Sequence, residues 1–333
     1  MAMNSVLQPW ARACAASPAL RFVDLNLRGV GQVMFQDNPL SGLLFLAAIA
    51  WGAVAGGAVQ VLAGGVLGLV SGTLMAMWLR ADAQSLASGL YGYNAVLVGL
   101  ALPTFLAPSP LLWCYVVLGG AVSVVCMLGA VNVTRAWSVS ALTFPFVLTT
   151  WLLLLATYGF AGLQGTALPF ANRIEPIDPA AANLLVPADF VTGLLHSVSQ
   201  VFLKGNGVSA LLFLAGLAVG SLPAAAFGLG GALLAVVTAH ALGAESELIS
   251  AGLMGFSPVL TAIALGAVFY KPTPRVAAYA MLGTVFTVIV QAALNVLLTP
   301  FGIPTLTAPF VLASWIFLLP RQQFGAAETA DAG

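Results

Sequence analysis

The chain reads LRGVGQVMFQDNPLSGLLFLA at residues 27–47 and LHSVSQVFLKGNGVSALLFLA at residues 195–215. These stretches align without a gap, end in the same run LLFLA and are identical at the following pairs: Leu27/Leu195, Val30/Val198, Gln32/Gln200, Val33/Val201, Asn38/Asn206 and Ser41/Ser209. Two further pairs follow in the same order: GLYGYNAVL at 89–97 with GLMGFSPVL at 252–260, and LTFPFVLTTW at 142–151 with LTAPFVLASW at 306–315. The chain therefore contains an internal duplication.

The composition is that of a membrane protein. Of the 333 residues, 6% are charged and 61% are hydrophobic, whereas soluble domains have about 25% charged residues. We therefore predict an all-α polytopic membrane protein. The net charge of zero gives no reason to expect nucleic acid or anionic ligands. The three cysteines have no metal-binding or disulfide spacing, so no metal or other cofactor is expected.

Polar breaks divide each half into five expected spans, and the stretches 32–39 and 200–207 predict a break in the first of them. The expected spans are 38–54, 57–79, 94–106, 111–131 and 137–158, then 206–222, 225–242, 258–269, 276–298 and 305–319. A short segment precedes the third span of each half, at 82–91 and 245–255. Short segments with glycines at matching places in two repeats often mark a transport site, so we predict that both are half-spanning pore helices.

An odd number of spans in each half requires opposite orientations, that is, two inverted repeats. One face then receives eight basic residues: Arg12, Arg21, Arg28, Arg80, Arg135, Lys271, Arg275 and Arg321. The other face receives Arg173, and Lys204 is ambiguous. The positive-inside rule places both termini in the cytoplasm, for a multi-pass protein of the plasma membrane, the inner membrane in a bacterium. The expected divisions are a cytoplasmic segment 1–26, a first repeat 27–158, an outer connecting loop 159–190, a second repeat 191–320 and a cytoplasmic tail 321–333.

Charge is nearly absent from the expected spans. Ion-coupled carriers keep ionisable residues there, whereas here Asp37 and Lys204 come nearest and can be explained by a pore mouth or by snorkelling. His196 and His240 do not occupy matching positions and are expected at boundaries. This pattern favours a passive route for a neutral solute.

The repeated polar residues are the candidates for contacting that solute. Thr143 and Thr307 occupy equivalent positions and could face one another, although a lone Thr usually bonds to its own helix. The prolines that follow them remove backbone donors and leave carbonyls free. Asn38 and Asn206 precede apolar runs and are expected to be N-caps.

Three segments, QVMFQDNPLSGLLFL, SGLYGYNAVLVG and LTFPFVLTTW, together with their second-half counterparts, resemble the urea transporter family over residues 27–319. The second half departs from the family pattern at 206–210, where it reads NGVSA. The resemblance implies ten transmembrane helices, two half-spanning pore helices and a homotrimer with one pore per subunit.

The resemblance also implies roles for particular residues. Gln32 and Gln200 would bond urea at the two ends of a filter, with Thr143 and Thr307 in the middle. Aromatic slots and apolar walls would come from Phe35, Tyr93, Phe256, Leu203 and Leu253, and from Leu97, Leu260, Val201 and its aligned partner Val33. Carbonyls at the ends of 82–91 and 245–255 would accept hydrogen bonds from urea.

The predicted function is therefore passive, selective permeation of urea. A channel for another neutral solute, such as water, glycerol or an amide, is one alternative, and an ion-coupled carrier, disfavoured by the missing charge, is another. A non-conducting scaffold or receptor would need neither paired polar positions nor broken helices. An enzyme is not expected, since no nucleophile–base arrangement or metal spacing is visible.

Overall fold

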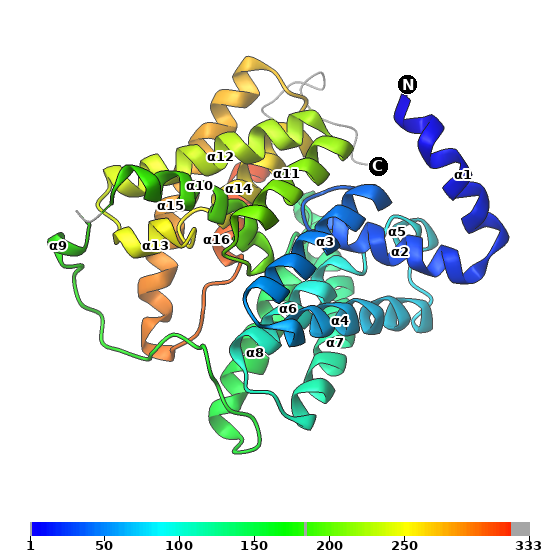
Figure 1. Ribbon diagram of the computed structural model, residues 1–333, viewed down its shortest axis with the longest axis horizontal. Coiled ribbons are helices and arrows are strands. Elements are labelled where there is room, and N and C mark those ends of the chain that lie inside the picture. Colours follow the sequence, from blue (N-terminus) through cyan, green and yellow to red (C-terminus); the bar gives the residue numbers. More distant parts are fainter. Residues whose placement is uncertain (1, 183–184, 321–333) are drawn as a thin grey trace.

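The computed structural model describes residues 2–182 and 185–320, and every regular element in that part of the chain is a helix (Figure 1). The predicted all-α class is therefore confirmed. The first half contains α1 (Ala2–Ala16), α2 (Pro18–Gln32), α3 (Pro39–Ala55), α4 (Val59–Trp78), α5 (Ala83–Ala87), α6 (Tyr93–Phe105), α7 (Pro110–Thr134) and α8 (Phe144–Ala156). After the short α9 (Pro179–Ala182), the second half repeats this order from α2 onward with α10 (Pro187–Ser199), α11 (Gly207–Gly220), α12 (Leu222–Ala241), α13 (Ser246–Ser250), α14 (Phe256–Ile263), α15 (Pro274–Leu298) and α16 (Ala308–Leu318).

Among the described residues, four helical stretches are long and apolar enough to cross a membrane: Val59–Trp78, Pro110–Trp137, Leu222–Ala241 and Pro274–Phe301. They correspond to the second and fourth expected spans of each half. Pro187–Phe202 and Gly207–Gly220 pass the same test together but meet at 69°, so the break expected at 200–207 is present. The protein is thus a multi-pass membrane protein.

Two predictions about helix extent were wrong. The helix in the expected span 137–158 begins late, because residues 138–143 are not helical and α8 starts at Phe144. Pro145 fits there, in the first helical turn, where its missing N–H has no partner to lose. The expected half-spanning helices 82–91 and 245–255 contain only α5 and α13, five residues each. At 1.5 Å per residue, each is roughly 8 Å long, about half of what a half-span requires.

The longer helices that end inside the molecule are instead α2 and α10. α2 begins at Pro18, within the segment 1–26 that was expected to precede the first repeat. Ser17 caps it, accepting a hydrogen bond from the backbone N–H of Leu20. Asn38 caps α3 in the same way through Leu40, and Asn206 caps α11 through Ser209, as predicted.

The duplication extends to unusual backbone angles. Phe35 and its aligned partner Leu203 have φ angles of 62° and 58°. Leu142 and Leu306, also aligned, have φ angles of 52° and 49°. Left-handed backbone is uncommon for residues other than glycine, so these matched values show that the repeated sequences make the same turns.

The two halves contact each other through α3 and α11, which lie next to each other in Figure 1. The Ser209 hydroxyl donates to the Ala48 carbonyl at 2.8 Å. Gly216 has no side chain to block the ring of Phe45, which would lie 2.6 Å from an added Cβ. The Ser209–Ala48 hydrogen bond and the packing of Phe45 on Gly216 both join the two halves. Together they fix the position of α3 along α11.

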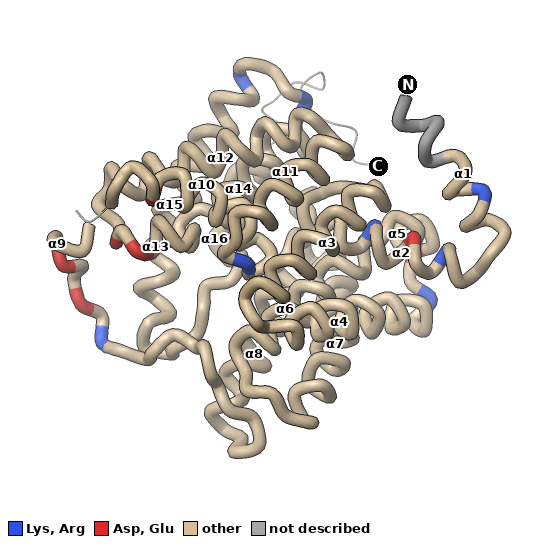
Figure 2. The backbone as a smooth tube through the Cα atoms, viewed as in Figure 1, with Lys and Arg blue, Asp and Glu red and all other residues tan. Residues whose placement is uncertain are grey.

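Charged residues lie mainly on connections, at helix ends and on α1 and α2, away from the middle of the four long apolar helices α4, α7, α12 and α15 (Figure 2). Asp37 forms an ion pair with Arg28 at 2.5 Å, and Arg28 also bonds Asp24 at 2.7 Å. Lys204 lies in the connection between α10 and α11, is 7% exposed and has its stem against Gly52. Gly52 belongs to the first half of the chain, so packing between the two halves explains why the Lys204 stem is buried.

Candidate functional site

The two halves meet at a pair of hydroxyl groups. Thr143 and Thr307 immediately precede α8 and α16, and their Oγ1 atoms share a hydrogen bond of 2.6 Å. Both residues are 3% exposed. Equivalent residues of the two repeats therefore face one another, rather than each bonding only to its own helix.

Two tryptophans make reciprocal contacts around this pair. Trp151 donates its ring N–H to the carbonyl of Pro304, and Trp315 donates its ring N–H to the carbonyl of Ser140, both at 2.8 Å. Each donor is the aligned counterpart of the other, and so is each acceptor. Reciprocal contacts are what a two-fold relation between two surfaces produces. They hold the turns before Thr143 and Thr307 together.

Gln32 and Gln200 stand at the ends of α2 and α10. The Gln32 amide donates to the carbonyl of Ser88 at 2.9 Å, and the Gln200 amide donates to the carbonyl of Ala251 at 3.1 Å. These carbonyls follow α5 and α13, where acceptors for the solute were expected. A carbonyl oxygen has two lone pairs, so each retains acceptor capacity beside a glutamine amide oxygen.

Of the predicted aromatic residues, Tyr93 forms a hydrogen bond and Phe35 packs against other rings. The Tyr93 hydroxyl donates to the Leu142 carbonyl at 2.6 Å and so fixes the turn before Thr143. Phe35 packs edge-on against Phe269 and Phe310, with ring centroids 5.9 and 6.2 Å away. The hydrogen bond of Tyr93 and the ring contact of Phe35 with Phe310 thus place both aromatic residues close to the turns that carry the threonines.

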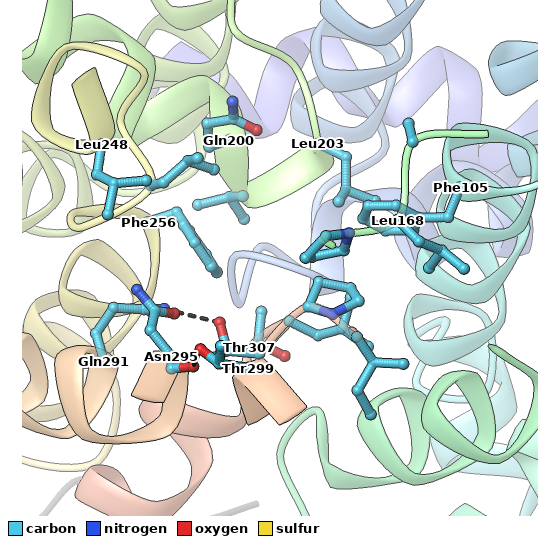
Figure 3. Close-up of a pocket in the computed structure, with 18 of the residues that line it drawn as sticks. Phe105, Leu168, Gln200, Leu203, Leu248, Phe256, Gln291, Asn295, Thr299 and Thr307 are labelled. Carbon is cyan, nitrogen blue, oxygen red and sulfur yellow. Dashed lines mark hydrogen bonds between the residues drawn. The ribbon is translucent and has the colours of Figure 1, made fainter. Parts of the chain in front are cut away.

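A cavity of about 630 Å³ opens on one side of the threonine pair (Figure 3). It is large compared with the ~30 Å³ that one water molecule occupies in the liquid. Six of the predicted residues line it, all from the second half: Gln200, Val201, Leu203, Leu253, Phe256 and Thr307. No charged side chain is among the described residues that line it. Such a lining suits a neutral solute that forms hydrogen bonds.

The other predicted residues do not line this cavity. Val33, Leu97 and Leu260 are at most 2% exposed and belong to the main hydrophobic core. Gln32, Phe35, Tyr93 and Thr143 come from the first half and lie beyond its lining. The structure thus brings the second-half candidates other than Leu260 to one cavity and leaves the first-half candidates outside it.

Five polar residues that line the cavity were missed by sequence reasoning: Thr166, Gln291, Asn295, Thr299 and Thr305. The sequence-based prediction of solute contacts used only polar residues that both halves share. When Pro110, the first residue of α7, is aligned with Pro274, the first residue of α15, Gln291 corresponds to Met127. A polar residue with an apolar counterpart gives no repeat signal.

The histidines have local partners. His196 Nδ1 lies 2.9 Å from the Ser250 carbonyl oxygen, and the His240 ring packs edge-on against Phe190 at 5.1 Å. His196 therefore connects α10 to α13, one helical turn before Gln200. These contacts give both histidines structural positions.

Comparison with known proteins identifies the family of this chain. The urea transporter family model matches residues 23–322. Urea transporter 1 of Ovis aries is 31% identical over 312 residues, which cover 90% of this chain and 77% of that protein. Urea transporter 1 of Capra hircus is 31% identical over 314 residues, and that of Rattus norvegicus is 29% identical over 309 residues, with the same shares covered. The chain belongs to the urea transporter family.

Proposed function

We propose that this protein is a channel-type transporter for passive, selective permeation of urea. The observation that carries the proposal is the Thr143–Thr307 contact, where equivalent hydroxyls of the two halves meet beside an uncharged cavity. Family membership supports urea as the solute, because the relatives carry the name urea transporter. The pathway runs from the cavity past this pair into the first half, between the ends marked by Gln32 and Gln200.

The chemistry of the pathway suits urea, which is planar, neutral and rich in N–H donors. Removing such a molecule from water without replacement bonds costs roughly 2–7 kcal/mol for each polar group left unpaired. The carbonyls of Ser88 and Ala251 and the two threonine hydroxyls provide acceptors in series. Several weak sites along a path allow solute both to enter and to leave, which favours flux over capture.

Urea flux in proteoliposomes tests the proposal. We expect stopped-flow light scattering to show urea entry down its gradient at a rate that proton or sodium gradients do not change. Glycerol should enter more slowly than urea, because it is not planar and does not fit the aromatic slots expected to hold urea flat. Urea accumulation that requires an ion gradient would identify an ion-coupled carrier, and glycerol or water flux without urea flux would identify another neutral-solute channel.

The arrangement in the membrane is part of the same proposal: two inverted repeats of five spans, both termini cytoplasmic and residues 159–190 outside, in a homotrimer of the plasma membrane. In a variant with Cys14, Cys114 and Cys126 replaced by Ser, Glu175→Cys should react with an impermeant maleimide added to intact cells. Arg80→Cys should react only after the cells are opened. Both side chains are exposed, so burial does not bias the comparison. Labelling of both from the same side would rule out inverted repeats.

A further inference from the structure

We propose that Gln291 contacts the solute directly and forms, with Asn295 and Thr305, a urea subsite that exists in the second half only. This inference rests on the proposed function, since it assigns a further contact within the same pathway. The subsite lies in the wall of the cavity next to Thr307 (Figure 3). It takes small neutral solutes that carry N–H donors.

The hydrogen bonds of Gln291 orient its amide group. Gln291 lies on α15, lines the cavity and is 1% exposed. Its Nε2 donates to Asn295 Oδ1 at 3.0 Å and to Thr305 Oγ1 at 2.7 Å. Asn295 in turn directs its own Nδ2 toward the sulfur of Met254 at 3.8 Å. Both N–H bonds of the Gln291 amide are therefore used.

The amide oxygen of Gln291 is left over. It is buried and accepts no hydrogen bond from any of the described residues. Burying an acceptor without a partner costs free energy, and in native proteins such a group usually has a water or ligand as its partner. Gln291 lines a cavity large enough for a small solute. A urea N–H group at this wall would give the oxygen its missing donor.

The first half has no such subsite. The positions aligned with Gln291, Asn295 and Thr305 are Met127, Val131 and Ala141. Met127 accepts a weak hydrogen bond from Asn94 through its sulfur at 3.6 Å, and the other two side chains have no polar atom. The pathway therefore has an added acceptor on one side of the threonine pair, so the duplication does not make its two sides equivalent.

The experiment measures how urea flux saturates. Gln291→Met keeps the side-chain length, removes the acceptor and reproduces the residue of the first half. We expect the half-saturating urea concentration to rise about three- to tenfold, as the loss of one neutral hydrogen bond predicts. The maximal urea flux at saturating concentration should stay within a factor of about two of its original value, because a merely structural defect would lower it. The matched control, Met127→Leu, should leave the half-saturating concentration unchanged.

The outcomes separate the inference from the proposed function. If the unsubstituted protein conducts urea and Gln291→Met, eluting as a single species, saturates at the same urea concentration, the subsite is wrong while the channel stands. Should Gln291→Met not fold, Thr305→Val decides, because it removes only the hydroxyl that orients the amide. An unchanged half-saturating concentration in Thr305→Val would then overturn the subsite. If the unsubstituted protein does not conduct urea, the proposed function itself fails.

Discussion

The double variant Thr143→Val with Thr307→Val will conduct urea roughly 5- to 150-fold more slowly than the original protein. In the proposed pathway, urea would replace the threonine–threonine hydrogen bond with bonds to both hydroxyls. Valine has nearly the same shape but no acceptor. The lost hydrogen bonding at a buried point corresponds to about 1–3 kcal/mol in the permeation barrier. Stopped-flow urea flux in proteoliposomes of equal protein content measures the difference.

Thr149→Val is the matched control for this prediction. Thr149 lies on α8, the helix that follows Thr143, and its buried hydroxyl has no partner among the described residues. Removing an unpaired buried hydroxyl should not destabilise the protein, and urea flux should be unchanged. Each single variant, Thr143→Val or Thr307→Val, should conduct less than the original. If both single variants conduct as fast as the original protein, the threonines do not line the pathway.

Gly89→Ala will give little or no folded protein. Gly89 has φ +78°, and an added Cβ would lie 2.4 Å from the backbone nitrogen of Gly29. The left-handed conformation costs roughly 1–2 kcal/mol for alanine, and forcing a methyl group against packed backbone costs about 1–3 kcal/mol more. The turn carries the Ser88 carbonyl that accepts from Gln32, so any protein that folds should also conduct urea poorly.

Two other glycines separate these effects. Gly57 has φ +63° but no described atom within 4 Å of an added Cβ, so Gly57→Ala tests the backbone conformation alone. Gly129 lies inside α7 with no described atom within 4 Å, so Gly129→Ala should stabilise the helix by up to about 1 kcal/mol. Thermal unfolding in detergent should rank Gly129→Ala above Gly57→Ala and Gly57→Ala above Gly89→Ala. Equal midpoints for Gly89→Ala and Gly57→Ala would show that the close contact with Gly29 has no cost.

The position of Gln32 shows where local reasoning failed. Gln32 was expected at the edge of the first span, yet it ends α2, a helix with many polar residues. α2 packs against α3 so closely that a Cβ on Gly42 would overlap the Leu27 carbonyl. Burial by neighbouring helices, rather than its own apolarity, therefore places the C-terminal part of α2 inside the molecule. A search for apolar runs does not detect such a helix.

The sequence by itself determined the helical class, the long apolar helices, the N-caps at Asn38 and Asn206, and the pairing of Thr143 with Thr307. These follow from composition, from short-range capping chemistry and from repetition, all of which can be read along the chain. Only the tertiary structure decided that α2 and α10, rather than 82–91 and 245–255, are the longer helices that end inside the molecule, and that Gln291 joins the cavity wall. Those outcomes depend on which helices pack together, and contacts between residues far apart in the chain leave no local pattern unless both halves repeat them.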